Sequence, residues 1–430
     1  MIIVPLSVIA LLFLANKKVI GKNKKTLFDP VSCFLLIWFF AFILHFFHFG
    51  VHDYTLTGYL IILLSCSSLC VGYWAFSRFR NDKQTRTKEY NIPFLNRLLL
   101  VLTIVEAIRL ILYYYYVIHV LAGGLGYFIA NGTEVRNKYL FTSAPSWYNV
   151  TEFLLNINAM VGYVLLGIHL AKNKKRSKYL ILIIWAIVEF LSAYFTNSKL
   201  SFVAFVFVVC FSFFNNVSGH RAQLKKAAII LPVALLASVV LFLALGKLRN
   251  YGEGDSLLRS VWMKIIDYFA GPIEALCKLV NTNSSDLGVA ENTFAFVFRI
   301  LSRLGLTEKS FLHSQNFIEI GDSMTNVYTW CKPFYLDLSV IGCFIYPLAI
   351  GSCSALLMRG NSNTLTQSNS LAWIGMCLSL SFFTFMWEYT IYIAILFYGA
   401  IVDRLFSKTL YLYEKKQCFV RGNNCIVLSK

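Results

Sequence analysis

Basic side chains recur in the connectors between the apolar runs of this chain. A guanidinium group pairs with phosphate through two hydrogen bonds and stays charged when it is partly desolvated. Cations that meet at one membrane face therefore suit the diphosphate head group of a lipid-linked ligand. The alternative is that each cation only covers apolar surface and touches lipid phosphate. The candidates are Arg136, Lys199, Arg249, Arg259, Arg299 and Arg303.

Two of these cations, Lys199 and Arg249, lie at the mouth of an apolar run, which favours a binding role over a purely interfacial one. Arg249 belongs to the stretch GKLRNYGEGD (246–255), which carries two cations and two anions. Glycine permits backbone conformations that other residues avoid, so Gly252 and Gly254 let the chain turn there.

Aromatic side chains accompany the charges in the same polar connectors. Flat apolar faces next to carboxylate and amide groups suit sugar rings. The alternative is the interfacial aromatic belt that membrane proteins show in general. The candidates carried forward are Tyr251, Tyr328 and Trp330.

Motifs of soluble enzymes are absent from the sequence, which has no P-loop, no HExxH, no GxSxG and no Cys/His metal spacing. The sequence has no tight cluster of carboxylates of the kind that binds a metal. We therefore expect neither a metal nor a cofactor.

The composition predicts an all-α polytopic membrane protein. Hydrophobic residues form 58% of the 430 residues and charged residues only 14%. One soluble core could not hide so much apolar surface. About eleven runs have membrane-spanning length, within a range of ten to twelve. The runs are 2–15, 31–48, 58–76, 98–121, 150–170, 179–195, 200–214, 227–246, 335–357, 370–386 and 389–406.

The positive charge is concentrated in alternate connectors, which hold most of the 39 Lys and Arg residues. The positive-inside rule assigns these connectors to the cytoplasm, so we expect the N-terminus outside and the C-terminus inside. The net charge of +18 is then an orientation signal rather than a nucleic-acid-binding surface. The basic regions are 16–25, 77–90, 171–178, 219–226, 358–363 and the tail from Asp403.

The predicted organisation follows from this topology. Residues 1–246 would form the first eight spans with a smaller outward loop at 122–149, and residues 247–334 a large outward loop. Residues 335–406 would form the last three spans and 407–430 a cytoplasmic tail. Within the large loop, apolar residues recur at helical spacing in 256–280 and 292–306, which predicts two amphipathic helices on or in the outer leaflet.

Charged residues also lie inside two spans. Glu106 and Arg109 share one face of the fourth span, which favours a structural ion pair. Glu189 lies inside the sixth span and has no obvious partner in the sequence. Charges at such depth usually face a partner or a cavity.

The chain resembles the Wzy-type O-antigen and capsular-repeat polymerases, which are membrane glycosyltransferases of the bacterial inner membrane. The resemblance rests on the span number, the basic connectors and the outer loops. It also rests on three local stretches: GKLRNYGEGD, YFAGPIEAL (268–276) and TNVYTWCKPFYLDLSVIGCF (325–344). The interval from Arg259 to Gly271 is one residue longer than the arginine-to-glycine spacing of some of these polymerases.

The resemblance implies a metal-independent enzyme that transfers a growing glycan from undecaprenyl diphosphate to a sugar hydroxyl of a new lipid-linked repeat unit, at the periplasmic face. The six cations would stabilise the departing diphosphate, with Arg249 also counted as catalytic. His313, Glu253, Asp255 and Asp322 are candidates for the base or for holding sugar, and His313 is favoured for its near-neutral pKa. Asn326 joins Asp322 and the three aromatic residues as a sugar ligand. A chain-length regulator protein is a further expected partner.

Other functions compete with this one. A flippase of lipid-linked oligosaccharides would need internal repeats and a charged central cavity. An O-antigen ligase differs only in its acceptor. A dolichol-type transferase would need acidic residues in the first outer loop, which has only Asp53. A membrane acyltransferase would need an essential histidine, for which His45, His48 and His119 are available.

Overall fold

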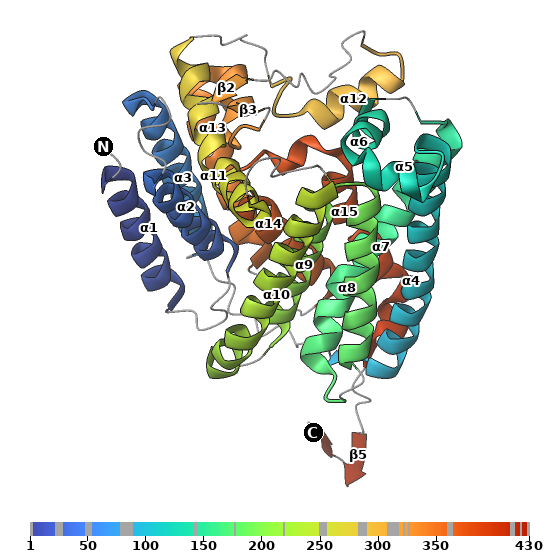
Figure 1. Cartoon of the computed structure of the whole chain (residues 1–430). Helices are drawn as coiled ribbons and strands as arrows, with labels where there is room; N and C mark the ends of the chain where they lie inside the picture. Colours follow the sequence, from blue (N-terminus) through green and yellow to red (C-terminus); the bar gives the residue numbers. More distant parts are fainter. Residues whose placement is uncertain are drawn as a thin grey trace.

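Long helices form nearly all of the regular structure in the computed structural model (Figure 1). Nine helices in the described part of the chain are long and apolar enough to cross a membrane, which confirms an all-α multi-pass membrane protein. The structure describes residues 3–21, 29–47, 54–77, 89–141, 144–175, 178–217, 220–248, 256–282, 290–307, 318–320, 323–325, 327–358, 364–412, 418–421 and 424–427.

Seven of these nine candidate spans are single helices. The span at α13 (Cys331–Met358) is kinked by non-helical backbone at Leu338 and Ser339, and α4 (Ile92–Tyr113) is continued by the π-helical turn η1 (Tyr114–Leu121). The start of α4 shows how the sequence defines a boundary. The Asn91 side chain accepts a hydrogen bond from the Phe94 amide, and a proline follows in the first turn. The others are α2 (Pro30–Phe47), α3 (Leu56–Ser77), α7 (Ser146–Lys172), α8 (Lys178–Phe195), α9 (Lys199–Asn216), α10 (His220–Leu248) and α15 (Thr390–Leu410).

The predicted span at 370–386 is wrong in its extent. The helix there, α14 (Leu365–Ser379), has only 15 residues. A largely buried segment, 380–389, follows it and contains the 3-10 turn η2 (Met386–Glu388), where the sequence predicted a tight turn. Apolar residues continue past Ser379, so hydropathy does not reveal where the helix ends.

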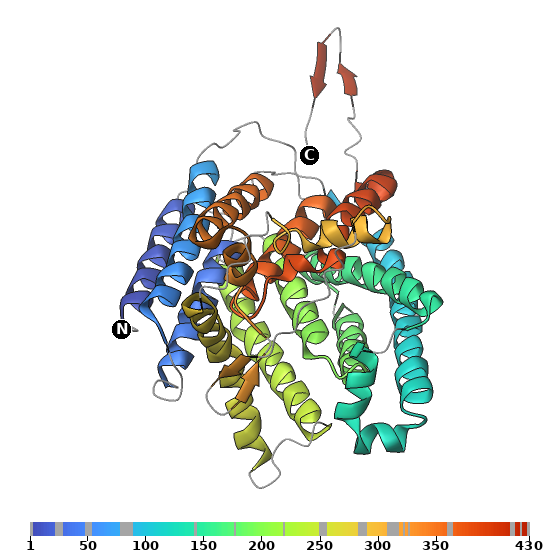
Figure 2. The same cartoon turned by 90° about the horizontal axis from the view of Figure 1, so that it is seen from above.

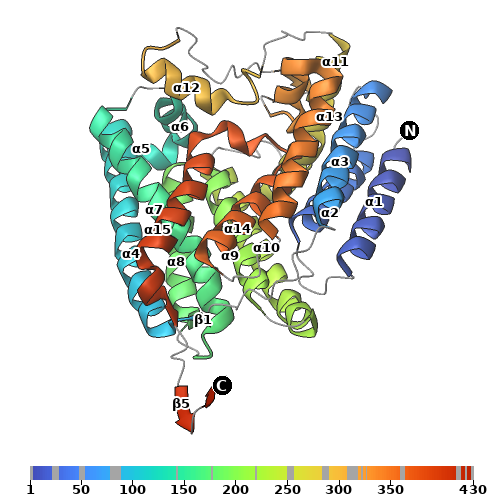
Figure 3. The ribbon, with the colours of Figure 1, turned by 180° about the vertical axis from the view of Figure 1, so that it is seen from behind.

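Tertiary hydrogen bonds hold this non-helical segment. The Trp38 indole donates to Ser381 Oγ at 2.9 Å, and the Trp330 amide donates to the Ser381 carbonyl at 2.8 Å. Backbone that is not helical is tolerated beside apolar spans only when the protein itself satisfies its polar groups. Segment 380–389 therefore belongs to the interior, and α14 beside it is buried among α2, α9 and α15 (Figure 3).

The closest helix pair is α3 with α13, because glycine lets their backbones approach. A Cβ at Gly72 would lie 2.1 Å from the Leu348 carbonyl oxygen, and one at Gly351 would lie 2.0 Å from that of Leu69. Small residues drive helix association in membranes for this reason. The N-terminal helix α1 (Ile3–Gly21), which corresponds to the predicted run 2–15, packs against α2 and α3.

The two ends of the bundle carry different connectors (Figures 1 and 2). One end, the loop face, carries α5 (Leu125–Ala130), α6 (Gly132–Phe141), α12 (Ala295–Arg303) and the hairpin of β2 (Ile318–Ile320) with β3 (Ser323–Thr325). The opposite end, the tail face, carries the ladder of β1 (Glu89–Tyr90) with β4 (Tyr411–Leu412) and the hairpin of β5 (Cys418–Arg421) with β6 (Asn424–Val427).

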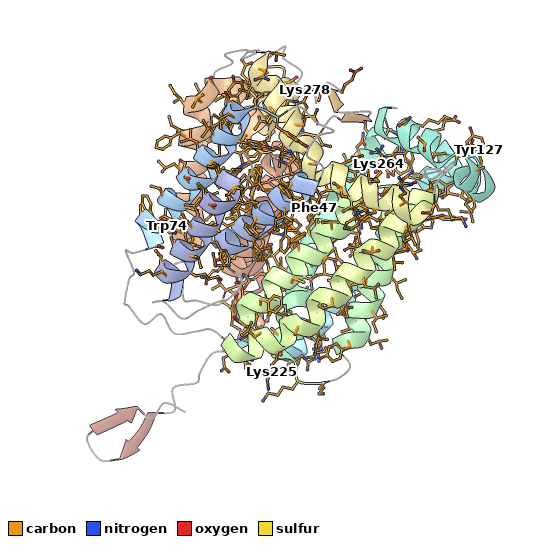
Figure 4. The ribbon with its side chains drawn as sticks, turned by 60° about the vertical axis from the view of Figure 1, so that its left-hand side comes forward. Phe47, Trp74, Tyr127, Lys225, Lys264 and Lys278 are labelled. Carbon is orange, nitrogen blue, oxygen red and sulfur yellow. The ribbon has the colours of Figure 1, made fainter. Side chains whose placement is uncertain are left out.

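The pairing of β1 with β4 joins two segments that the sequence assigned to the same side. Figure 4 likewise shows Lys225 at the tail face, and Tyr127 and Lys264 toward the loop face. Which face lies outside the cell stays a prediction.

Helix α11 (Leu257–Asn281) extends the predicted amphipathic segment into the bundle. Its first turns are exposed at Leu258 and Trp262, whereas every residue from Ala270 to Cys277 is buried. The helix continues through Pro272, and burial changes near that point. This second half packs against α2 and α3, so part of the large loop lies inside the bundle rather than on a leaflet surface.

Candidate functional site

Three segments that carry predicted cations meet at the loop face. Asn197, in the turn between α8 and α9, donates from its side-chain amide to the Gly132 carbonyl at 3.1 Å. A Cβ at Gly132 would lie 2.5 Å from Leu248 Cγ, so the start of α6 also touches the end of α10. Arg136 follows one turn into α6, Lys199 begins α9, and Arg249 follows Leu248 directly in the sequence.

Lys199 lies where four parts of the chain converge. Its half-buried ammonium is 4.3 Å from the centre of the Phe242 ring of α10 and 4.9 Å from that of Tyr268 of α11. Tyr268 in turn contacts Phe383 of segment 380–389. Two aromatic faces hold an ammonium by cation–π attraction. The positive charge is therefore held in place at the start of α9.

The charges on α6 fall into two groups. Lys138 pairs with Glu134 at 2.8 Å, and Tyr127 donates to the same carboxylate at 2.8 Å. The Lys138 and Tyr127 hydrogen bonds lower the pKa of Glu134, and the Glu134 bond raises the pKa of Lys138. The charge of Lys138 is thus balanced by Glu134 within α6. Arg136 lies between Glu134 and Lys138 in the sequence and is half-buried.

The remaining described candidates for diphosphate binding lie on α11 and α12. Arg259 is exposed in the first turn of α11, and Arg299 is half-exposed on α12. The carboxylate of Asp337 anchors the start of α12 by accepting from the backbone amides of Asn292 and Thr293 at 2.9 and 2.7 Å. Helix α12 packs against η2, so segment 380–389 touches both α12 and the Tyr268 ring beside Lys199.

Several predicted residues lie outside the described part of the chain, so their roles stay predictions. The Arg303 backbone ends α12, but its side chain is not described. The others are Arg249, Tyr251, Glu253, Asp255, His313, Asp322 and Asn326.

The two described sugar-binding candidates are buried. Trp330 is 1% exposed and packs against Phe34 and Phe334, with ring centres 5.2 and 5.5 Å away, so it acts as a core residue in this structure. The Lys332 ammonium lies 3.8 Å from the centre of the Tyr328 ring, and burial raises the pKa of Tyr328.

The structure also shows residues that the sequence did not single out. Asn197 has a left-handed backbone, with φ of 49°, and Asn in TNSK is a type of residue that tolerates this conformation in turns. Phe242 and Phe383 have no comparable feature in the sequence, because each lies in a predicted span and resembles the other apolar residues there. Their role beside Lys199 and Tyr268 follows from tertiary packing alone.

Glu189, for which the sequence offered no partner, meets the Glu106–Arg109 pair. Arg109 Nη2 lies 2.6 Å from Glu189 Oε1, and Arg109 Nε donates to Glu106 Oε1 at 2.8 Å. The expected structural ion pair is confirmed and has a third member from α8.

His45, one of the described histidines, is buried inside the bundle. It packs edge-on against Tyr54 with ring centres 3.6 Å apart, and its Nδ1 lies 3.3 Å from the Tyr59 hydroxyl. Within the described ranges no three His, Cys, Asp or Glu side chains come together as a metal site.

Comparison of the chain with protein-family models, with curated proteins and with solved structures finds no match in any of the three. The case for a function therefore rests on the residues and geometry of the loop face.

Proposed function

We propose that this protein polymerises undecaprenyl-diphosphate-linked oligosaccharide repeat units at its loop face, which we assign to the periplasmic side of a bacterial inner membrane. The product would be an O-antigen or a capsular glycan. The observation that carries the proposal is the position of Lys199. Its ammonium is held between two aromatic rings, beside the segments that bear Arg136 and Arg249.

The reaction needs what this arrangement offers. The hydroxyl oxygen of the acceptor sugar forms a bond to the anomeric carbon of the donor glycan, while the bond from that carbon to the diphosphate breaks. Negative charge develops on the departing diphosphate, and cations already in place stabilise it without reorganising at the moment of reaction. Arg136, Lys199 and Arg249 would do this, with the cations of α11 and α12 at the edges of the site.

The acceptor proton must leave in the same step. His313, Glu253, Asp255 and Asp322 are the candidates to take it. The lipid tails of donor and acceptor would remain in the bilayer against the exposed apolar faces of the spans, with the head groups at the height of Lys199. A chain-length regulator protein would act on the same growing polymer.

A deletion strain tests the function. Loss of a polymerase leaves one repeat unit on each lipid core, because export and ligation continue without it. Complete loss of surface glycan would instead indicate a flippase or a ligase and would overturn the proposal. Complementation with the unmodified chain should restore the full range of glycan lengths.

A further inference from the structure

An acidic and basic network lies inside the bundle, away from the loop-face cations. Glu106 and Arg109 come from α4, Glu189 from α8 and Tyr163 from α7, and all four side chains are buried. The Tyr163 hydroxyl donates to Glu189 Oε1, the oxygen that also faces Arg109. Arg109 Nη1 donates to Asn156 Oδ1 at 2.9 Å. The proposed polymerase reaction uses none of these groups.

The charges of this network do not balance. Two carboxylates face one guanidinium, so full ionisation would leave one net negative charge among apolar helices. An uncompensated charge in such a place is strongly unfavourable. In the described part of the chain, the other titratable groups that face the network are Tyr113 and Glu152, and neither is a cation. A bound metal cation would have to compete with the guanidinium that already occupies the space.

The hydrogen bonding of the two carboxyl groups is also incomplete. Glu106 Oε2 and Glu189 Oε2 are both buried and have no hydrogen-bond partner in the described part of the chain. Oε1 of each carboxyl group lies against the same nitrogen, Arg109 Nη2, so the two groups are close neighbours. Two carboxylate oxygens both accept and neither donates. One proton between them would supply the missing donor and balance the charge at the same time.

Polar side chains also hold Arg109 from the side of α7. Asn156 Oδ1 accepts from Arg109 Nη1 and from the Tyr113 hydroxyl, the latter at 3.0 Å. The guanidinium is therefore fixed against both carboxyl groups.

We propose that Glu106 and Glu189 form a proton-binding site that holds one proton between them, balanced by Arg109. The ligand is the proton itself.

Infrared spectroscopy of the purified full chain in lipid nanodiscs tests this site. At neutral pH the unmodified protein should show a protonated carboxyl band that shifts when water is replaced by heavy water. Glu106→Gln and Glu189→Gln should each abolish the band, because either change leaves one carboxylate balanced by Arg109. The matched control Glu134→Gln, at an exposed ion pair of α6, should keep it.

Absence of the band in the unmodified protein would overturn the site, as would its survival in either glutamine variant. If a glutamine variant fails to fold, the unmodified protein still decides whether an exchangeable proton is present.

Discussion

The Lys199 ammonium lies 4.9 Å from the centre of the Tyr268 ring, so the first turn of α9 is joined to the middle of α11 by a cation–π contact. This contact links the bundle to the segment that the sequence identified as an outer loop. It places a positive charge beside segment 380–389 and at the loop-face ends of two spans.

Lys199→Ala should slow glycan polymerisation roughly 10- to 100-fold, because one lost contact to a charged group is worth about 1.5–3 kcal/mol. Lys199→Arg should retain most of the activity, since it keeps the charge. The measurement is the distribution of glycan lengths in the complemented deletion strain, at matched protein levels. Lys225→Ala at the tail face is the control and should behave as the unmodified chain. Full-length glycan from Lys199→Ala would remove Lys199 from the site.

Asn197→Ala should lower the stability of the protein by about 1–3 kcal/mol, because alanine disfavours the left-handed backbone and cannot bond to the Gly132 carbonyl. Asn197→Gly should be less damaging, since glycine adopts that backbone freely and loses only the hydrogen bond. Thermal unfolding in detergent measures both. Equal melting temperatures for Asn197→Ala and the unmodified chain would show that this turn does not hold α6 in place.

Gly72→Ala should destabilise the α3–α13 pair, because the new methyl group would overlap the Leu348 carbonyl oxygen. Overpacking of this kind typically costs about 1–3 kcal/mol. Gly126→Ala is the matched control, as a Cβ there has open space around it. The prediction fails if the two variants have the same melting temperature.

Asp29→Asn should make the protein more stable at neutral pH. Burial raises the pKa of Asp29, even though Ser32, Lys17 and Asn16 favour the ionised form. The folded chain therefore holds this proton more tightly than the unfolded chain. Stability is fully present below the ordinary pKa of an aspartate, about 3.9, and falls as the pH rises through the raised pKa.

The asparagine variant lacks this fall and can still accept from the Ser32 amide, as Asp29 Oδ1 does at 2.8 Å. Its gain in melting temperature should be a few degrees at pH 7 and should shrink as the pH is lowered. A gain that is the same at all pH values would point to packing rather than ionisation.

Membrane sidedness can be measured with single cysteines at the two faces. Lys264→Cys should react with an impermeant thiol reagent in spheroplasts, whereas Lys225→Cys should react only after permeabilisation (Figure 4). The unmodified chain gives the background from its own cysteines. The reverse pattern would place the loop face in the cytoplasm and would exclude a periplasmic polymerase.

The sequence predicted some spans closely, since residues 179–195 nearly coincide with α8. The fourth run was predicted at 98–121, whereas α4 begins at Ile92 after the Asn91 cap. The end of α14 could not be predicted, since Trp38 and Trp330 help to fix the following backbone from distant parts of the chain. Apolar composition is the same on both sides of that boundary.

The same difference between local features and tertiary packing applies to the candidate site. Lys199 was a candidate because a cation at a span mouth is visible in the sequence, and Arg136 because it lies in a predicted outward loop. The ring of Phe242 and the partner of Glu189 were not predictable, as both depend on which helices pack together. Glu189 finds Arg109 across 80 positions of the chain, and neither residue's neighbours indicate the other.

The most direct test of the proposed function is polymerisation by the purified protein. The protein in lipid vesicles would be supplied with undecaprenyl-diphosphate-linked repeat units from its own host, and the products would be resolved by size. We expect a ladder of lipid-linked glycans that grows with time and is greatly reduced with Lys199→Ala. Repeat units that stay single with the unmodified, folded protein would contradict the account.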